Sequence, residues 1–303
     1  MASIESITLD WRGAELVSLI AEGKERLWQG DPHFWSRHAP VLFPIVGRLA
    51  NDTLRIDGVE YLMKQHGFAR DKNFYMSDYH EFLPYGDRVV ITPSSNMMSM
   101  ILVSEKPLPN YPYRFKLTVH YIIEDNKLQC SWVVENCDEK TMHFQIGAHP
   151  AFNLPDYNES DEIHGFIQCY DGQGNVVKPM VINHLVDGLR CSYGIPKTLV
   201  NDDAVIALTN TTFADDAILL EGNQIASAAL FDKNGRKVLT VTCPQADAFG
   251  IWAPSKPGCP FVCIEPWCGI ADRYNFNGDI SERDCNHSLA PGESFEFCYS
   301  LTI

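Results

Sequence analysis

One histidine of the sequence stands where its ring could do chemistry. His149 lies in FQIGAHPAFNLP (residues 144–155), between a Gly-Ala pair and a proline, with aromatic residues at both ends. The segment has the pattern of a strand that runs into a tight turn. Two interpretations stay open: a buried histidine whose ring nitrogens bond to the backbone, or a ring at the mouth of a pocket that hands over a proton.

A second segment of interest is CIEPWCGIADRYNFNGD (residues 263–279), which places tryptophan and other aromatic residues near a carboxylate. Aromatic faces beside carboxylates and amides suit sugars, which have apolar C–H faces and hydroxyl rims. The alternative is that these aromatic residues belong to the core, as do most of the 11% of residues that are aromatic.

The ten cysteines all lie beyond residue 129. No signal-peptide pattern is visible in MASIESITLDWRG, and a disulfide framework would be denser, so we expect reduced thiols that fill small core sites. Cys259, Cys263 and Cys268 lie close together in CPFVCIEPWC, and only Cys285 could complete them as zinc ligands. This spacing is poor for structural zinc. We therefore expect no metal site.

Charge and hydropathy exclude several classes of partner. Lys+Arg 24 against Asp+Glu 39 gives a net charge of −15, which disfavours nucleic acid and anionic membrane surfaces. Apolar stretches such as APVLFPIVG are too short to span a bilayer. A hydrophobic content of 45% with 21% charged residues is typical of a globular protein. We expect a cytoplasmic protein that binds a small molecule, with its oligomeric state open and a homodimer included.

Alternation of apolar and polar residues with a period of two dominates the sequence. RFKLTVHYI and LQCSWVVEN, separated by the polar turn EDNK, predict a hairpin, and SAALFDKNGRKVLTVTC predicts another around Asn234-Gly235. ESFEFCYSLTI predicts a long strand near residue 300. Shorter strands are expected in DRVVITP, SMILVSE, AVIALTN and DAILLEG.

The signal for helices is weak. GAELVSLIAEGKERLW (residues 13–28) could form an amphipathic helix, but Gly23 interrupts it, and two short strands around EGKE fit equally well. No linker, charge block or repeat divides the chain. Residues 1–303 are therefore expected to form a single all-β domain, a large antiparallel β-sandwich.

Several common motifs are missing from the sequence. It contains no G-x-G-x-x-G after a strand, no G-x-x-x-x-G-K-[ST], no G-x-S-x-G and no H-E-x-x-H. Nucleotide cofactors, serine hydrolysis and zinc-protease chemistry therefore lose support, and we expect no cofactor.

Four segments in order resemble the aldose 1-epimerase (mutarotase) family, in its bacterial branch similar to LacX proteins. They are LFPIVGRLAND (42–52), QHGFARD (65–71), IGAHPAFNLP (146–155) and VCIEPWCGIAD (262–272). The resemblance covers essentially the whole chain. It implies the galactose mutarotase-like supersandwich, in agreement with the strand pattern, and an enzyme that interconverts the anomers of an aldose.

The resemblance also implies the catalytic pair. His149 matches the histidine that acts as general acid on the ring oxygen, and Glu265 matches the glutamate that acts as general base on the anomeric hydroxyl. An unperturbed glutamate is anionic near neutrality and a histidine titrates close by, so we expect the pair to work without large pKa shifts. Opening a pyranose needs no redox cofactor and no covalent intermediate.

Further residues match positions that bind the sugar in this family. Arg48 and His66 match residues that hold hydroxyl groups. Asp216 matches a substrate-binding aspartate, although the neighbouring Asp215 leaves the register open. Trp252 and Phe152 match aromatic residues beside the sugar ring.

Two departures from the galactose mutarotase pattern leave the preferred sugar open. Gly47 stands where an asparagine usually precedes the arginine, and a histidine pair is reduced to His66. HGFAR is similar to a sister group that acts on hexose 6-phosphates. Arg70, with Lys64 as a helper, could bind such a phosphate, or Arg70 could pair with Asp71 and order the loop. We favour a neutral aldose.

Other functions use the same residues differently. A non-catalytic carbohydrate-binding or sugar-sensing protein would need the aromatic residues but not an acid together with a base. A glycoside hydrolase could use Glu265 and Asp216 as its two carboxylates, but it would give His149 no role. An interaction protein on the same scaffold would leave the four segments without a function.

Overall fold

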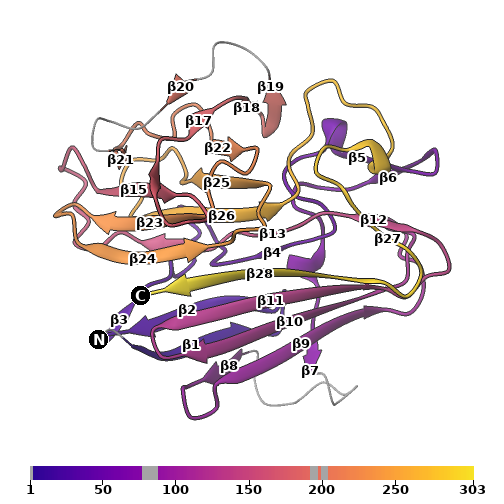
Figure 1. Cartoon of the computed structure of the whole chain (residues 1–303), viewed down its shortest axis with the longest axis horizontal. Helices are drawn as coiled ribbons and strands as arrows, with labels where there is room; N and C mark the ends of the chain where they lie inside the picture. The colour runs from indigo at the N-terminus through magenta and orange to yellow at the C-terminus, as the bar shows by residue number, and fades with distance from the viewer. Residues whose placement is uncertain (1–2, 77–87, 192–196, 199–203) are drawn as a thin grey trace.

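The computed structural model describes residues 3–76, 88–191, 197–198 and 204–303, and these form an almost entirely β structure (Figure 1). The helical pieces in these ranges are three 3-10 turns, η1 (Ala50–Asp52), η2 (Ala69–Asp71) and η3 (Ile280–Glu282). The prediction of an all-β fold is confirmed. No helix of the described residues is long and apolar enough to cross a membrane.

The largest sheet has ten strands. Each strand pairs antiparallel with its neighbours. In spatial order the strands are β16 (Val176–Val177), β15 (Gly165–Tyr170), β23 (Ser227–Asp232), β24 (Lys237–Thr242), β28 (Ser294–Thr302), β11 (Lys127–Asn136), β10 (Phe115–Glu124), β9 (Met97–Ser104) and β7 (Tyr75–Met76), with β21 (Val205–Leu208) also paired to β15. In Figure 1 this sheet extends from β23 and β24 at the left to β28, β11, β10 and β9 in the lower half.

Two smaller sheets and four strand pairs complete the fold. The four-stranded sheet has the order β3 (Lys24–Glu25), β2 (Glu15–Ala21), β1 (Ile4–Asp10) and β8 (Arg88–Ile91). The six-stranded sheet has the order β22 (Ile218–Glu221), β25 (Ala248–Trp252), β26 (Phe261–Cys268), β13 (Ile146–Ala148) and β4 (Val41–Leu42), with β14 (Ala151–Asn153) also on β26. The pairs are β12 (Met142–Phe144) with β27 (His287–Leu289), β17 (Met180–Val181) with β20 (Lys197–Thr198), β18 (His184–Val186) with β19 (Leu189–Cys191), and β5 (Thr53–Ile56) with β6 (Val59–Leu62).

The predicted strands occur where the period-two pattern places them. β10 and β11 form the first hairpin, with Glu124 opposite Lys127 at the turn, and β23 and β24 form the second around Asn234-Gly235. The shorter predicted strands are β8, β9, β21 and β22. Residues 13–28 form the strands β2 and β3 rather than a helix, because Glu22 and Gly23 adopt positive φ and reverse the chain.

Buried aromatic side chains hold the sheets together. Along β10 the inward residues Phe115, Leu117, Val119 and Tyr121 are fully buried. The hydroxyl of Tyr121 donates a hydrogen bond of 2.9 Å to the carbonyl oxygen of Ala14, just before β2, and so joins the ten-stranded sheet to the four-stranded sheet. Burial of each such side chain contributes about 1.5–3 kcal/mol. The core therefore lies between sheets that face each other.

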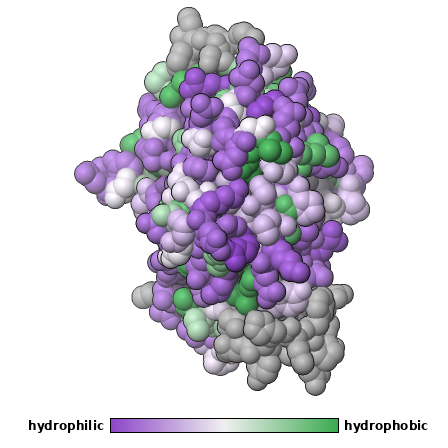
Figure 2. All heavy atoms as spheres, turned by 90° about the vertical axis from the view of Figure 1, so that its right-hand side faces the viewer, coloured by the Kyte–Doolittle hydropathy of each residue, from purple (hydrophilic) through white to green (hydrophobic). Residues whose placement is uncertain are grey.

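One face of the molecule is mostly polar. Figure 2 shows the right-hand side of Figure 1 as largely hydrophilic, with hydrophobic residues in small groups rather than in one broad patch. Scattered exposed apolar side chains are normal for a folded domain. All ten cysteines are free thiols. A homodimer stays a prediction.

A buried ion pair fixes the loops above the six-stranded sheet. The Nε of Arg283 lies 2.6 Å from Oδ1 of Asp272, and both side chains are at most 4% exposed. Asp272 also accepts a hydrogen bond from the backbone N–H of Ala50 through Oδ2, while Nη2 of Arg283 donates to the carbonyl oxygen of Ile270. The pair therefore links the segment that carries Arg48 to the end of β26.

We predict that Asp272→Ala lowers the free energy of unfolding by about 3–5 kcal/mol, because it leaves the guanidinium of Arg283 buried without its partner. Urea unfolding followed by fluorescence measures this change. The control is Glu139→Ala, which removes a pair with Arg114 in which the two side chains are 93% and 35% exposed. The control should cost less than about 1 kcal/mol. Equal losses in the two variants would contradict the role of the buried pair.

Candidate active site

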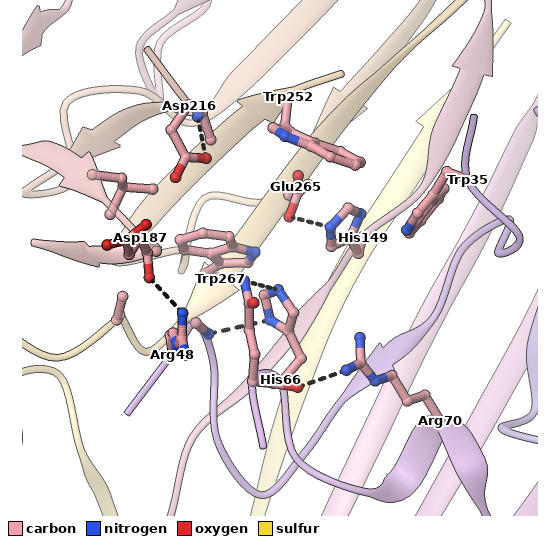
Figure 3. A pocket seen from close by; sticks show the side chains of 16 residues that line it. Trp35, Arg48, His66, Arg70, His149, Asp187, Asp216, Trp252, Glu265 and Trp267 are labelled. Atoms are coloured by element: carbon pink, nitrogen blue, oxygen red, sulfur yellow. Dashed lines mark hydrogen bonds and ion pairs between the residues drawn. The ribbon is translucent and has the colours of Figure 1, made fainter. Parts of the chain in front are cut away.

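A cavity of about 400 Å³ opens over the six-stranded sheet and gathers most of the predicted residues. His149, Glu265, Arg48, His66, Asp216, Arg70 and Trp252 all line it. Figure 3 shows their side chains converging on one space from strands and loops far apart in the sequence.

The register of three strands places His149 opposite Glu265. β13 and β14 both pair with β26, with Gly147 opposite Trp267 and Ala151 opposite Cys263. His149 lies in the break between β13 and β14, and the same register continued through the break sets it across from Glu265. Directly opposed residues of antiparallel strands point to the same face. The tight turn expected around His149 is this short break between two strands.

The two side chains are in contact and almost completely buried. Nε2 of His149 lies 3.2 Å from Oε2 of Glu265, and the side chains are 8% and 2% exposed. Trp35 stacks on the imidazole with ring centroids 4.8 Å apart, and Trp252 meets it edge-on at 5.8 Å. The aromatic rings fix the orientation of the histidine and keep bulk water from the pair.

Burial shifts both pKa values, contrary to the expectation of an unperturbed pair. Desolvation raises the pKa of Glu265 well above its usual value; Trp267 acts against this rise, and the charge of Asp216 adds to it. Desolvation, with the positive charge of Arg70, lowers the pKa of His149 to about 3. Each charged form is unfavourable in this site. The pair therefore holds a single proton over a wide range of pH.

Trp267 forms one wall of the cavity because two glycines leave space for its ring. A Cβ at Gly147 would lie 2.9 Å from Cδ1 of Trp267, and a Cβ at Gly250 would lie 2.9 Å from Cζ2. These distances are too short for real carbon contacts. Gly250 also pairs with Glu265, so no side chain from β25 crowds the carboxyl group. The indole thus lies against the strands that carry the pair.

His66 is held as a neutral ring. Its pKa is lowered well below the usual value by burial, and further by the charges of His149 and Arg70. The backbone N–H of Gly47 donates to Nδ1 at 3.2 Å, so the neutral ring carries its proton on Nε2. Nε2 lies 3.3 Å from the side-chain amide of Gln65, whose oxygen can accept that proton once the amide is turned. His66 has a positive φ of 65°, which is uncommon for a residue with a side chain and frequent at functional sites.

Gly47 explains one departure from the galactose mutarotase pattern. Its φ is +69°, and a Cβ there would lie 2.5 Å from Cα of Ala271. An asparagine at this position would require the backbone near Ala271 to move. The departure is therefore part of the local packing between the Arg48 segment and the end of β26.

Arg48 and Asp216 lie on the rim of the cavity. The Nε of Arg48 is 3.2 Å from Oδ1 of Asp52, and its Nη1 donates to the carbonyl oxygen of Asp187 at 3.1 Å. Asp216 lines the cavity, whereas Asp215 lines only the outer groove formed with the β18–β19 hairpin. Asp216, rather than its neighbour, is therefore the aspartate that lines the cavity of the His149–Glu265 pair.

Arg70 supports the loop that carries His66. Its Nη2 donates a 2.6 Å hydrogen bond to the carbonyl oxygen of Gln65. The carboxylate of Asp71 lies 2.8 Å from Arg37 instead. Burial, with the charge of Arg37, lowers the pKa of Arg70 to about 10, so it stays cationic near neutrality. Lys64 is not among the described residues that line the cavity.

Phe152 does not take the place beside the sugar ring that the sequence suggested. Its side chain is fully buried in the main core, and it is absent from the described residues that line the cavity. Side chains alternate between faces of extended backbone, and Phe152 lies three residues after His149, so it points to the opposite face. Trp35 stacks on His149 instead.

Sequence reasoning missed several lining residues. Trp267 lies two residues after Glu265 on one strand, so period-two reasoning could have placed both on the same face. Trp35 and Gln65 gave no comparable signal. Asp187 precedes Gly188 in the turn of the β18–β19 hairpin, a typical turn pair, but nothing in the sequence places that turn over the cavity.

The cysteines considered as zinc ligands do not gather into one set. Among the described residues, two groups of three possible metal ligands occur, and each contains only one of those four cysteines. One group is His149, Cys263 and Glu265, whose ligand atoms lie within 4.8 Å of one another. In it His149 and Glu265 already contact each other. The other group lies outside the cavity.

Comparison with known proteins identifies the family. The family model described as aldose 1-epimerase matches residues 5–302. The chain belongs to the aldose 1-epimerase family. The LacX protein encoded on a plasmid of Lactococcus lactis subsp. lactis is 27% identical over 308 residues, which cover 99% of this chain and 97% of that protein.

Solved structures of aldose 1-epimerase relatives share the fold. A galactose mutarotase related enzyme from Lactobacillus acidophilus is 31% identical with a TM-score of 0.83, covering 100% of this chain and 97% of that one. A galactose mutarotase-like protein from Lactobacillus casei is 25% identical with a TM-score of 0.82, covering 99% and 97%. The predicted galactose mutarotase-like supersandwich is therefore confirmed.

Proposed function

We propose that the protein is an aldose 1-epimerase that interconverts the α and β anomers of a free hexose. The observation that carries this proposal is the buried contact of 3.2 Å between His149 and Glu265 at the cavity. O1 and O5 of a pyranose are bonded to the same carbon, so ring opening needs a base and an acid side by side. Family membership supports the same reaction.

The reaction follows from the proton that the pair holds. Burial favours the neutral pair, in which Glu265 holds the proton, so the reactive form arises when that proton crosses the 3.2 Å contact to His149. Glu265, now the carboxylate, removes the O1 proton, and His149, now the imidazolium, donates its proton to O5 while the C1–O5 bond breaks. The open aldehyde rotates about C1–C2, and closing on the other face returns both protons with the roles exchanged. No atom is added or lost, and no redox partner is needed.

The surrounding residues suit a sugar. His66 presents an N–H donor, Asp216 presents acceptors and Arg48 a cation, which together match hydroxyl groups on a ring. Trp252 and Trp267 add apolar faces for the C–H groups. These contacts would hold C1 against the pair and fix the sugar during opening.

The competing functions explain the site less well. A sugar-binding protein gains nothing from a buried acid and base in contact, because each costs desolvation free energy. A glycoside hydrolase built on Glu265 and Asp216 leaves the contact with His149 without a purpose. Proton NMR of freshly dissolved α-glucose shows whether the protein speeds up anomer exchange, as an epimerase would, or leaves the rate unchanged, as a binding protein would. Release of the chromophore from a chromogenic glycoside would detect hydrolysis.

A neutral aldose fits the cavity better than a hexose 6-phosphate. The cationic side chains among the described lining residues are Arg48 and Arg70, and both already donate to backbone carbonyls. Arg37 lies near Arg70 but is paired with Asp71. The dianion would therefore have to break existing hydrogen bonds. The unpaired Nε of Arg70 is the one observation that favours phosphate.

We predict that Glu265→Gln and His149→Asn each lower kcat/KM by about 10²–10⁴-fold, because each removes one of the two proton-transfer groups. The double variant should lose less than the product of the single losses, since both groups act in one step. Polarimetry or anomer-exchange NMR measures the rates. Glu60→Gln and His164→Asn, which lie outside the cavity, are the controls. Full activity in Glu265→Gln would refute the mechanism.

We predict a broad pH profile. A second proton reaches the pair only as pH falls toward the pKa of His149, about 3, and the last proton leaves only above the raised pKa of Glu265. The acid limb of the kcat/KM profile should therefore lie near pH 3, whereas an unperturbed glutamate would place it at about 4.3. The alkaline limb should follow the raised pKa of Glu265. Initial rates corrected for spontaneous mutarotation test this. A narrow bell-shaped kcat/KM profile that ends below about pH 6.5 would contradict the conclusion that the pair holds one proton over a wide range of pH.

We predict that glucose or galactose exchanges faster than its 6-phosphate, and that Arg70→Ala slows both classes, because the Arg70 hydrogen bond to Gln65 holds the His66 loop. Exchange NMR with both substrate classes measures the effect, and Arg55→Ala, on the exposed β5–β6 hairpin, is the control. Preference for phosphates in the wild type, lost selectively in Arg70→Ala, would show that the substrate assignment is wrong.

A further inference from the structure

A second cluster of reactive side chains lies outside the cavity. Asp247 immediately precedes β25, Cys268 is the last residue of β26, and His287 is the first residue of β27. One ligand atom from each lies within 4.8 Å of the other two. None of the three lines the cavity of the His149–Glu265 pair. The cluster is therefore independent of the proposed reaction.

Two polar atoms of the cluster are buried without a hydrogen-bond partner. These are Oδ2 of Asp247 and Nε2 of His287. They face each other at 3.7 Å, too far for a hydrogen bond. Buried polar atoms nearly always have a hydrogen-bond partner. Two buried polar atoms that face each other without one therefore indicate a binding site for a ligand. A cation between them would satisfy both atoms at once.

The distance between Asp247 and His287 is close to that in a zinc site, and the atoms of Cys268 lie within 4.8 Å of both. Tetrahedral zinc with bonds of about 2.0–2.3 Å to oxygen, nitrogen and sulfur holds its ligand atoms about 3.3–3.6 Å from one another. The 3.7 Å between Asp247 and His287 needs only a small closure to reach this geometry. A thiolate with an imidazole selects zinc over calcium or magnesium, which prefer oxygen ligands.

Neighbouring residues already hold the three side chains in position. The ring of His287 lies against Phe295 at 4.5 Å and Phe144 at 5.7 Å between centroids. The backbone N–H of Asp247 donates to the carbonyl oxygen of Trp267 at 2.8 Å. The S–H of Cys268 donates to the carbonyl oxygen of Gln245 at 3.2 Å, and zinc would take the place of that proton. These contacts fix the positions of the three residues.

The carboxylate of Asp247 supplies negative charge beside Cys268. A divalent cation bound between them would stabilise the thiolate of Cys268.

We propose that Asp247, Cys268 and His287 bind a zinc ion, with water as the remaining ligand. The side chains of Asp247 and His287 are 25–26% exposed, so the ion has a path from solvent. The sequence argument against zinc rested on the spacing of the cysteines alone. Here only one ligand is a cysteine, and the aspartate and the histidine come from distant segments of the chain. The ion ties the ends of β25, β26 and β27 together beside Trp267.

Metal binding to the full-length protein without a histidine tag tests this site. The chelator-treated protein should take up one zinc per chain in calorimetry, and zinc should raise its Tm by several degrees. Cobalt should give the charge-transfer absorption of a metal–thiolate bond. Asp247→Asn, His287→Asn and Cys268→Ser should each abolish these effects. His120→Asn and Cys137→Ser, outside the cluster, should leave them unchanged.

The outcomes are distinguishable from those of the proposed function. Metal uptake and Tm do not depend on epimerase activity, so these measurements test the proposed metal site independently of the proposed enzymatic function. If Cys268→Ser does not fold, Asp247→Asn and His287→Asn, at partly exposed residues, still test the zinc site. No uptake by the wild type, uptake unchanged in Asp247→Asn and His287→Asn, or binding without a cobalt–thiolate band would overturn the proposal.

Discussion

The register of β13 and β14 on β26 is the constraint on which the site depends. It sets His149 opposite Glu265 across a break in pairing, and opposed residues of antiparallel strands stand about 5 Å apart. A shift of one residue would turn Glu265 to the other face. β26 is buried along its whole length, so such a shift would also displace its apolar side chains from the core.

Burial of an acid and a base in contact makes the site both costly and useful. Removal of water disfavours a charge on His149 and on Glu265, so the pair is most stable with one proton between them. Stacking by Trp35 and the close fit of Trp267 against two glycines maintain that dry environment. The sheet thus supplies proximity, and the aromatic residues supply low polarity.

The rim of the cavity is built from loops that the fold must hold in uncommon conformations. His66 and Asp216 both have positive φ, which costs free energy for residues with side chains. Hydrogen bonds from Gly47 and Arg70 fix the His66 loop. The buried pair of Asp272 with its arginine fixes the adjacent segment. The residues on loops that line the cavity are therefore positioned by buried polar contacts rather than by strand pairing.

The sequence by itself determined the strands, the hairpins and the candidate residues, because period-two alternation, turn pairs and short motifs are local signals. Tertiary structure alone decided which distant residues meet. It turned Phe152 into the core, put Trp35 on His149 and chose Asp216 over its neighbour. It also set the pKa values of the buried pair. These outcomes depend on strand register and burial between segments more than a hundred residues apart, and local patterns carry no information about either.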